Sequence, residues 1–299
     1  MKKTIISSSI LLLTAIIWGF AFVAQVQGME SVGTFTYNAI RFFIGTLVMV
    51  PAFFIFSRKK TNAKKFKRSM LFGLCAGMIL FAAATLQQYA IEFNSDGNSM
   101  KAGFITGLYT IAVPICSLFV FKKRTSIETW ISAAIAVIGL YLLCGVGQGS
   151  LHYTDILLFV SVLFWTAHIL FIDKLGDSVD VFVFSGSQYA ICGFLSFVGA
   201  LMFDRASLNF GAISSGILPI LYGGVLSVGV AYTLQFIGQK NADPTVAAII
   251  LSTESMFSAI GNLLILHVNM QPVQYVGCSL IFAGIILSQV KLKRTHKKQ

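Results

Sequence analysis

The sequence is divided by short polar connections into ten apolar stretches of about 20 residues each. A helix rises about 1.5 Å per residue, so about 20 residues cross the roughly 30 Å apolar core of a bilayer. The stretches lack the alternation of membrane β-strands, and a helix closes its backbone hydrogen bonds within itself. We therefore predict an all-α integral membrane protein with ten transmembrane helices, at residues 5–24, 35–56, 70–91, 100–121, 130–146, 155–172, 182–202, 213–237, 246–266 and 273–290.

Composition and charge favour a membrane protein without a separate soluble domain. Hydrophobic residues make up 56% of the chain and charged residues only 11%, whereas about 25% is usual in soluble proteins. The net charge of +11 comes from basic residues in short loops, where they meet anionic lipid. We therefore predict contacts with membrane lipid and no nucleic-acid partner. The first apolar stretch has no convincing cleavage site and is interpreted as an uncleaved span.

The distribution of Lys and Arg predicts the orientation in the membrane. Nineteen of the 22 basic residues lie in loops on the side of the N-terminus, and only Lys101 and Arg205 lie in loops on the opposite side. Because short basic loops stay in the cytoplasm, both termini are predicted to be cytoplasmic. The predicted location is the plasma or inner membrane, which the chain crosses many times.

The two halves of the sequence resemble each other. Trp18 and Trp165 occur in similar surroundings 147 residues apart. Three further matches keep the same order: Arg41 with Gln188, residues 85–87 with 233–235, and Gly139 with Gly284. We predict two five-helix repeats, at residues 1–146 and at residues 147–299 with a short basic cytoplasmic tail. An odd number of spans inserts the two repeats in opposite directions, and inverted repeats with a site between them are typical of secondary transporters.

Three motifs resemble the drug/metabolite transporter superfamily, and most closely its EamA family. They are WGFAFV in the first span, LQQYAIEFNSDGNSMKAGFITGLYTIAVP across the third and fourth, and AAIILSTESMFSAIGN in the ninth. The resemblance implies ten helices in two inverted repeats, cytoplasmic termini, a central cavity, and export of amino acids or other small metabolites. The chain departs from the family where Ser255 follows Glu254 in place of proline, and where Lys122 and His267 replace acidic residues at span ends. The substrate is therefore not transferred from the family.

Glu254 is the acidic residue that lies deepest in a predicted span. It follows Pro244 by ten residues, which is about 15 Å along a helix and half of the apolar core. A carboxylate at that depth is unfavourable unless it faces protein, water or an opposite charge. Glu254 is predicted to line a cavity, where it accepts a proton or binds a substrate ammonium group. The alternatives are a structural carboxylic acid or a permanent partner of Arg41.

Arg41 is the one basic residue well inside a span, about two turns from its outer end. Its planar fork suits the carboxylate of a substrate. The alternative is that the side chain extends along the helix to the outer interface.

Aromatic residues near the middle of the membrane are the next candidates for substrate binding. Trp18 and Trp165 are predicted to form cavity walls, although most membrane tryptophans anchor at interfaces. His168 lies three residues after Trp165, on the same helix face, and either titrates or forms an interhelical hydrogen bond. Tyr109 and Tyr232 are also placed near the middle of the membrane, with the choice between binding and packing left open.

Two amides and a proline complete the candidates. Gln87 and Gln235 orient a polar substrate or hydrogen-bond between helices. Pro114 removes a backbone hydrogen bond from the fourth span, which makes it either a hinge or a packed kink. Signatures of enzymes are missing: the sequence has no Walker A motif, no HExxH, no GxSxG, and no metal-ligand spacing among its four histidines. We predict no enzyme, no cofactor and no metal.

These observations predict a secondary transporter that exports a small organic metabolite, such as an amino acid, by alternating access. Its partners are the substrate, membrane lipid and, if Glu254 titrates, protons. Efflux of lipophilic cations is the main alternative, because Glu254 and the aromatic residues suffice for it. Metabolite uptake is a second alternative. A membrane enzyme or lipid-handling protein has no supporting motif, and bulky aromatic residues at mid-depth disfavour a channel.

Overall fold

The computed structural model describes residues 2–93, 99–122, 125–144, 152–267 and 269–289, and within them it contains helices and no strand. The prediction of an all-α protein is therefore confirmed. The α-helices are α1 (Lys2–Met29), α2 (Thr34–Phe56), α3 (Ala63–Glu92), α4 (Ser99–Gly107), α5 (Tyr109–Phe121), α6 (Ile127–Cys144), α7 (Tyr153–Leu175), α8 (Val181–Phe203), α9 (Phe210–Ser215), α10 (Ile217–Leu221), α11 (Thr233–Gln239), α12 (Pro244–Leu251), α13 (Glu254–Ile265) and α14 (Pro272–Gln289). Three other elements are the 3-10 helices η1 (Gly176–Ser178) and η2 (Arg205–Ser207) and the π-helix η3 (Tyr222–Tyr232).

Most of the helical length is suited to a membrane. Over the described residues, eight helical segments are long and apolar enough to cross a bilayer, and two shorter apolar helices cover Ile127–Leu143 and Pro272–Ser288. Large apolar side chains such as Leu47, Phe119 and Ile286 are exposed on the outside of the bundle, where a soluble protein would carry charges. The chain is a multi-span membrane protein. Ten spanning helices and their inverted relationship stay predictions.

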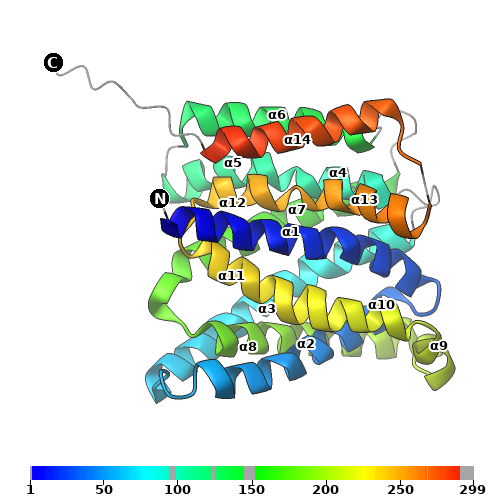
Figure 1. Cartoon of the computed structure of the whole chain (residues 1–299). Helices are drawn as coiled ribbons and strands as arrows, with labels where there is room; N and C mark the ends of the chain where they lie inside the picture. Colours follow the sequence, from blue (N-terminus) through cyan, green and yellow to red (C-terminus); the bar gives the residue numbers. More distant parts are fainter. Residues whose placement is uncertain (1, 94–98, 123–124, 145–151, 268, 290–299) are drawn as a thin grey trace.

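The long helices run side by side, and α1 begins at the same end of the bundle at which α14 ends (Figure 1). Helices α2, α3 and α8 pack closely along one edge, and α6 packs against α14 along the opposite edge (Figure 1). A close approach of backbones permits the second pairing, because a methyl group on Gly139 or on Gly277 would overlap the other helix. Helices α1 and α7 lie between the two edges, together with the α4–α5 and α12–α13 pairs.

Two of the predicted spans are broken near their middle. The fourth span is interrupted at Leu108 between α4 and α5, and Pro114, inside α5, cannot donate a backbone hydrogen bond to Thr110. The ninth span is interrupted at Ser252 and Thr253, whose hydroxyls donate to the carbonyl oxygens of Ile249 and Ile250 at 2.8 and 2.6 Å. Hydroxyls that bind the preceding turn in this way compete with regular helical bonds.

The two broken spans run antiparallel and touch where they are broken (Figure 1). The Ser255 hydroxyl donates to the carbonyl oxygen of Gly103 at 2.9 Å, from α13 to α4. Each break exposes the N-terminal end of a short helix, with backbone N–H groups that lack partners within that helix. The middle of the bundle therefore contains two helix N-termini, those of α5 and α13.

The eighth predicted span differs from an ordinary helix. Residues 213–237 form the end of α9, then α10, the π-helix η3 and most of α11. A π-helix of eleven residues is uncommon, because most are single turns within α-helices, often at functional sites. It ends at Tyr232, whose ring contacts those of Trp18, Phe42, Trp165, His168 and Tyr189. Apart from His168, these aromatic residues all belong to one hydrophobic core cluster.

Candidate functional site

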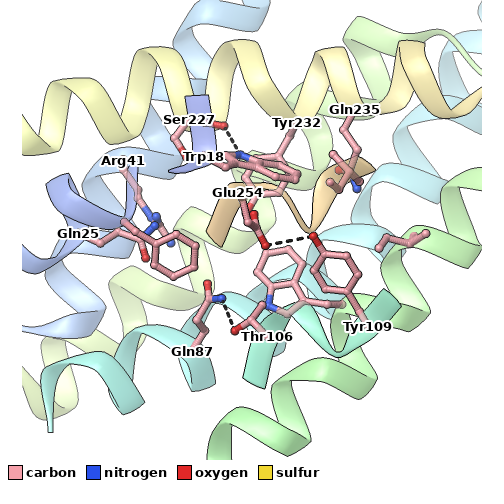
Figure 2. Close-up of a pocket in the computed structure, with 14 residues that line it drawn as sticks. Trp18, Gln25, Arg41, Gln87, Thr106, Tyr109, Ser227, Tyr232, Gln235 and Glu254 are labelled. Carbon is pink, nitrogen blue, oxygen red and sulfur yellow. Dashed lines mark hydrogen bonds between the residues drawn. The ribbon is translucent and has the colours of Figure 1, made fainter. Parts of the chain in front are cut away.

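A cavity opens among the helices at the level of the two breaks. Eight of the nine predicted binding residues line it: Trp18, Arg41, Gln87, Tyr109, Trp165, Tyr232, Gln235 and Glu254. They come from both halves of the sequence and converge on one space (Figure 2). The volume that the centres of water molecules can occupy in this cavity is about 30 Å³, which is enough for one or two waters. Their roles in binding stay predictions.

Glu254 is the first residue of α13, directly after the break in the ninth span. Its side chain is 6% exposed, and its Oε1 accepts a hydrogen bond of 3.1 Å from the Tyr109 hydroxyl (Figure 2). Tyr109 in turn is the first residue of α5, directly after the other break. A carboxylate at a helix N-terminus is favoured by the helix dipole. The break therefore gives Glu254 a polar environment inside an apolar span.

Arg41 lies on α2 with its side chain only 2% exposed, so it is turned inward and not toward the interface. Its guanidinium carbon lies 5.2 Å from the ring centre of Tyr37 and 5.1 Å from that of Phe42. Such contacts stabilise a cation through the faces of aromatic rings. Within the described part of the chain Arg41 forms no ion pair, and its Nε has no hydrogen-bond acceptor. The cavity therefore contains a cation that Glu254 does not neutralise by direct contact.

Aromatic side chains form one wall. The rings of Trp18 and Tyr232 are 4.7 Å apart at 60°, and those of Trp165 and Tyr232 are 6.2 Å apart and nearly parallel at 10°. The Trp18 Nε1–H donates to the carbonyl oxygen of Ser227 in η3 at 3.2 Å (Figure 2). The two tryptophans that the repeat pairs therefore both pack against Tyr232.

Two predicted residues lie outside the cavity. His168 is fully buried behind the wall, where its Nε2 is 3.0 Å from Gln188 Oε1 and its ring stands edge-on to both Trp165 and Tyr232. Pro114 lies within α5, beyond Tyr109, and does not line the cavity. Both residues contact or belong to elements that form the site, but neither faces its interior.

Six lining residues were missed by the sequence analysis: Phe22, Gln25, Thr106, Ile169, Ser227 and Leu251. Helical spacing from the predicted residues identifies most of them, because positions three, four or seven apart share a face. Gln25, for example, follows Trp18 by seven residues, and Thr106 precedes Tyr109 by three. Ser227 precedes Tyr232 by five residues, a spacing that only a π-helix places on one face.

The fold and the site together define a class. Buried charges and aromatic walls around a cavity, set between broken helices of a multi-span protein, are typical of membrane transporters. The sequence model of the EamA-like transporter family matches the chain twice, at residues 6–145 and at residues 152–289. The chain belongs to the EamA-like transporter family, so the predicted resemblance is confirmed.

Individual relatives agree with the family. An uncharacterized transporter of Archaeoglobus fulgidus is 27% identical over 282 residues, which cover 94% of this chain and 85% of the relative. The uncharacterized transporters YetK and YoaV of Bacillus subtilis are 22% and 21% identical and cover 89% and 93% of this chain, with 81% and 95% of their own lengths matched. A protein of known crystal structure matches the fold with a TM-score of 0.77 and 17% identity, over 95% of this chain and 96% of its own. The relatives are named as transporters, and nothing in these names indicates an enzyme.

Proposed function

We propose that the chain is a secondary transporter that exports a small zwitterionic metabolite, such as an amino acid, by alternating access. The Arg41 guanidinium binds the carboxylate of the substrate, and Glu254 binds its ammonium group or a proton. Trp18, Trp165 and Tyr232 enclose the substrate. The two predicted five-helix repeats, residues 1–146 and 147–299, move relative to each other around this site.

The observation that carries the proposal is a pair of opposite buried charges in one cavity without an ion pair between them. Arg41 is 2% exposed and Glu254 is 6% exposed, and both line the same space. A buried charge without a partner costs several kcal/mol, and either residue could be replaced by an apolar one if it served only packing. A zwitterion supplies each charge with its opposite and recovers this cost on binding.

The size of the cavity supports alternating access. At about 30 Å³ it holds one or two waters and no amino acid, so substrate binding requires the lining elements to move apart. The breaks at Leu108 and at Ser252–Thr253 lie in the lining spans and have fewer regular helical bonds to break. Pro114 weakens α5 further. We assign these points as the hinges.

Export and proton coupling are the two further parts of the proposal. Export is proposed because the motifs of the chain resemble those of a family whose members export amino acids and small metabolites. The Tyr109 hydroxyl bonds only one oxygen of Glu254, which leaves the other for a proton or an ammonium group. The excess of Lys and Arg in loops on the side of the N-terminus supports cytoplasmic termini in a plasma or inner membrane.

Efflux of lipophilic cations is the second candidate. The aromatic wall around Tyr232 and the carboxylate of Glu254 are the groups that bind such cations. The buried guanidinium of Arg41 acts against it, because it repels any cation that shares the cavity. Binding of a zwitterion uses both charges and is therefore favoured.

Counterflow in proteoliposomes tests the proposal. Vesicles containing the protein are loaded with unlabelled amino acids, nucleobases or lipophilic cations, and entry of the labelled compound is followed with and without a pH gradient. We expect saturable exchange of an amino acid that falls by about tenfold or more in Glu254→Gln, since a charged hydrogen bond to the substrate is lost. Glu30→Gln removes the same charge from the exposed loop after α1 and serves as the control.

Two outcomes would contradict the proposal. Normal amino-acid exchange by a folded Glu254→Gln protein, with an unchanged effect of the pH gradient, would remove Glu254 from binding and from coupling. Exchange of lipophilic cations alone would establish the second candidate. Loss of a pH-gradient effect in Glu254→Gln would assign proton coupling to this residue.

A further inference from the structure

The polar groups that line the cavity divide into two kinds. Some are satisfied within the protein: Trp18 by Ser227, Gln87 by Thr106 at 3.0 Å, and Glu254 by Tyr109. Others have no partner in the described part of the chain: Arg41 Nε, Gln25 Oε1, Trp165 Nε1 and Gln235 Oε1. Buried polar atoms are nearly always hydrogen-bonded, so each exception calls for an explanation. A ligand with complementary polar groups would explain all four unpartnered atoms.

The unpartnered groups occupy different ends of the cavity. Figure 2 shows Arg41 and Gln25 at one end and Gln235 near Tyr109 at the other, with Glu254 between them. A zwitterion that binds Arg41 through its carboxylate and Glu254 through its ammonium group has used the first end and the middle. Its side chain is then directed toward Gln235.

We propose that Gln235 selects the substrate by its side chain, and that the substrate is an amino acid whose side chain ends in a hydroxyl or primary amide. This assignment rests on the proposed function. The donor of such a side chain pairs with Gln235 Oε1, which otherwise stays buried without a partner. An apolar side chain of the same shape leaves that oxygen unpaired, and sites built to bond a polar group discriminate strongly against analogues that lack it.

The surroundings of Gln235 hold it in place. Its helix, α11, begins at Thr233, whose hydroxyl donates to the Gly229 carbonyl at 2.8 Å and lies 3.1 Å from the Tyr189 hydroxyl. One turn after Gln235, the Gln239 amide donates to the Ile169 carbonyl oxygen at 3.4 Å. The backbone is therefore fixed on both sides of Gln235, whose side chain is 1% exposed. A fixed acceptor with apolar neighbours is suited to specificity.

Isosteric pairs of amino acids test the proposal. Threonine has a hydroxyl where valine has a methyl group, and asparagine has an amide where leucine has two methyl groups on its branched carbon. Their binding to the full-length protein in detergent is followed by tryptophan fluorescence, because Trp18 and Trp165 line the cavity. We expect threonine and asparagine to bind about tenfold or more tightly than valine and leucine.

Matched variants identify the residue responsible. Gln235→Met keeps the length of the side chain without its acceptor, and we expect both preferences to fall to about one. Gln235→Glu retains acceptor oxygens and is expected to keep the preferences, so their loss there overturns the proposal even if Gln235→Met does not fold. Gln88→Met is the control, because Gln88 is also a fully buried glutamine and does not line the cavity.

The outcomes separate this proposal from the one on which it rests. Equal binding within each pair, or a preference that persists in Gln235→Met, overturns the role of Gln235 and leaves amino-acid transport intact. Failure of all four amino acids to bind the folded wild-type protein overturns the assignment of Gln235, whereas the proposed function is overturned only if the counterflow panel shows no exchange of any zwitterion.

Discussion

Helices α2 and α8 hold matching places in the two halves of the sequence, but they differ in what they supply. Arg41 of α2 and Gln188 of α8 are 147 residues apart. Arg41 lines the cavity with an unpaired charge, whereas Gln188 is fully buried and is bonded to His168. One helix therefore places a charge in the cavity, and the other supports the aromatic wall from behind.

The starts of the two helices differ in a related way. At the same offset of 147 residues, α2 is preceded by Gly33 and α8 by Asp180. Asp180 caps its own helix by accepting hydrogen bonds from Phe182 N–H and Val183 N–H, both at 3.1 Å. Gly33 has no side chain, and carboxylates from distant parts of the sequence accept hydrogen bonds from the first N–H groups of α2. Glu92 accepts from Thr34 at 3.0 Å, and Asp204 accepts from Phe35 and Thr36 at 2.6 and 3.0 Å.

Similar halves can therefore carry different kinds of residue, with different partners, at matching positions. The cavity-facing charge lies on the helix whose N-terminus depends on its neighbours. The self-capped helix carries the neutral residue. Experiments that exchange or remove these residues can separate function from stability.

The largest effect is expected at Arg41. Arg41→Met removes the guanidinium and should reduce amino-acid exchange by about 100-fold, since bonds between charged groups contribute about 1.5–3 kcal/mol. Because an unpaired buried charge is also removed, the thermal unfolding midpoint should stay constant or rise. Proteoliposome exchange and thermal unfolding of the purified protein measure the two effects. Lower stability together with unchanged exchange would show that Arg41 is structural.

Gln188→Met is expected to show the opposite pattern. The change removes the partner of His168 and leaves a buried ring nitrogen unsatisfied, at a cost of about 1–3 kcal/mol of stability. Substrate affinity should change less than in Arg41→Met, because Gln188 does not line the cavity. Thermal unfolding and tryptophan-detected binding measure the two quantities. A loss of binding as large as that of Arg41→Met would mean that the two helices do not differ in role.

Most of the predicted cavity residues could be identified from the sequence, because polar residues in apolar spans are few. Glu254 and Arg41 stand out by charge, and the tryptophans by their repeated position. Eight of nine predicted residues consequently line one cavity. The exception is His168, which shares a helix face with Trp165. On that face Trp165 is directed to the cavity, whereas His168 is directed to Gln188 of α8.

Other features depend on tertiary structure and leave little signal in the sequence. The π-helix η3 packs against α1 and α2, and its apolar sequence is equally consistent with an α-helix. The break at Leu108 precedes Pro114 by six residues, so the proline alone does not locate it. The capping of α2 by Asp204 joins residues about 170 positions apart, and no local motif announces such a bond.

The smallest effect, and the sharpest test of the two helix starts, is expected at Asp204 and Asp180. Asp204→Ala removes the acceptor of two α2 N–H groups and should lower stability by about 1 kcal/mol, as for other lost helix caps. A carboxylate restored at the start of α2 itself is excluded, because any side chain at Gly33 would overlap Asp204. In Asp204→Ala that overlap is gone, so the added change Gly33→Asp should recover much of the loss. Asp180→Ala cannot be rescued in this way, because Asp180 is itself the N-cap of α8. Thermal unfolding of the four proteins tests this, and failure of Gly33→Asp to rescue Asp204→Ala would show that Asp204 acts through contacts other than the cap.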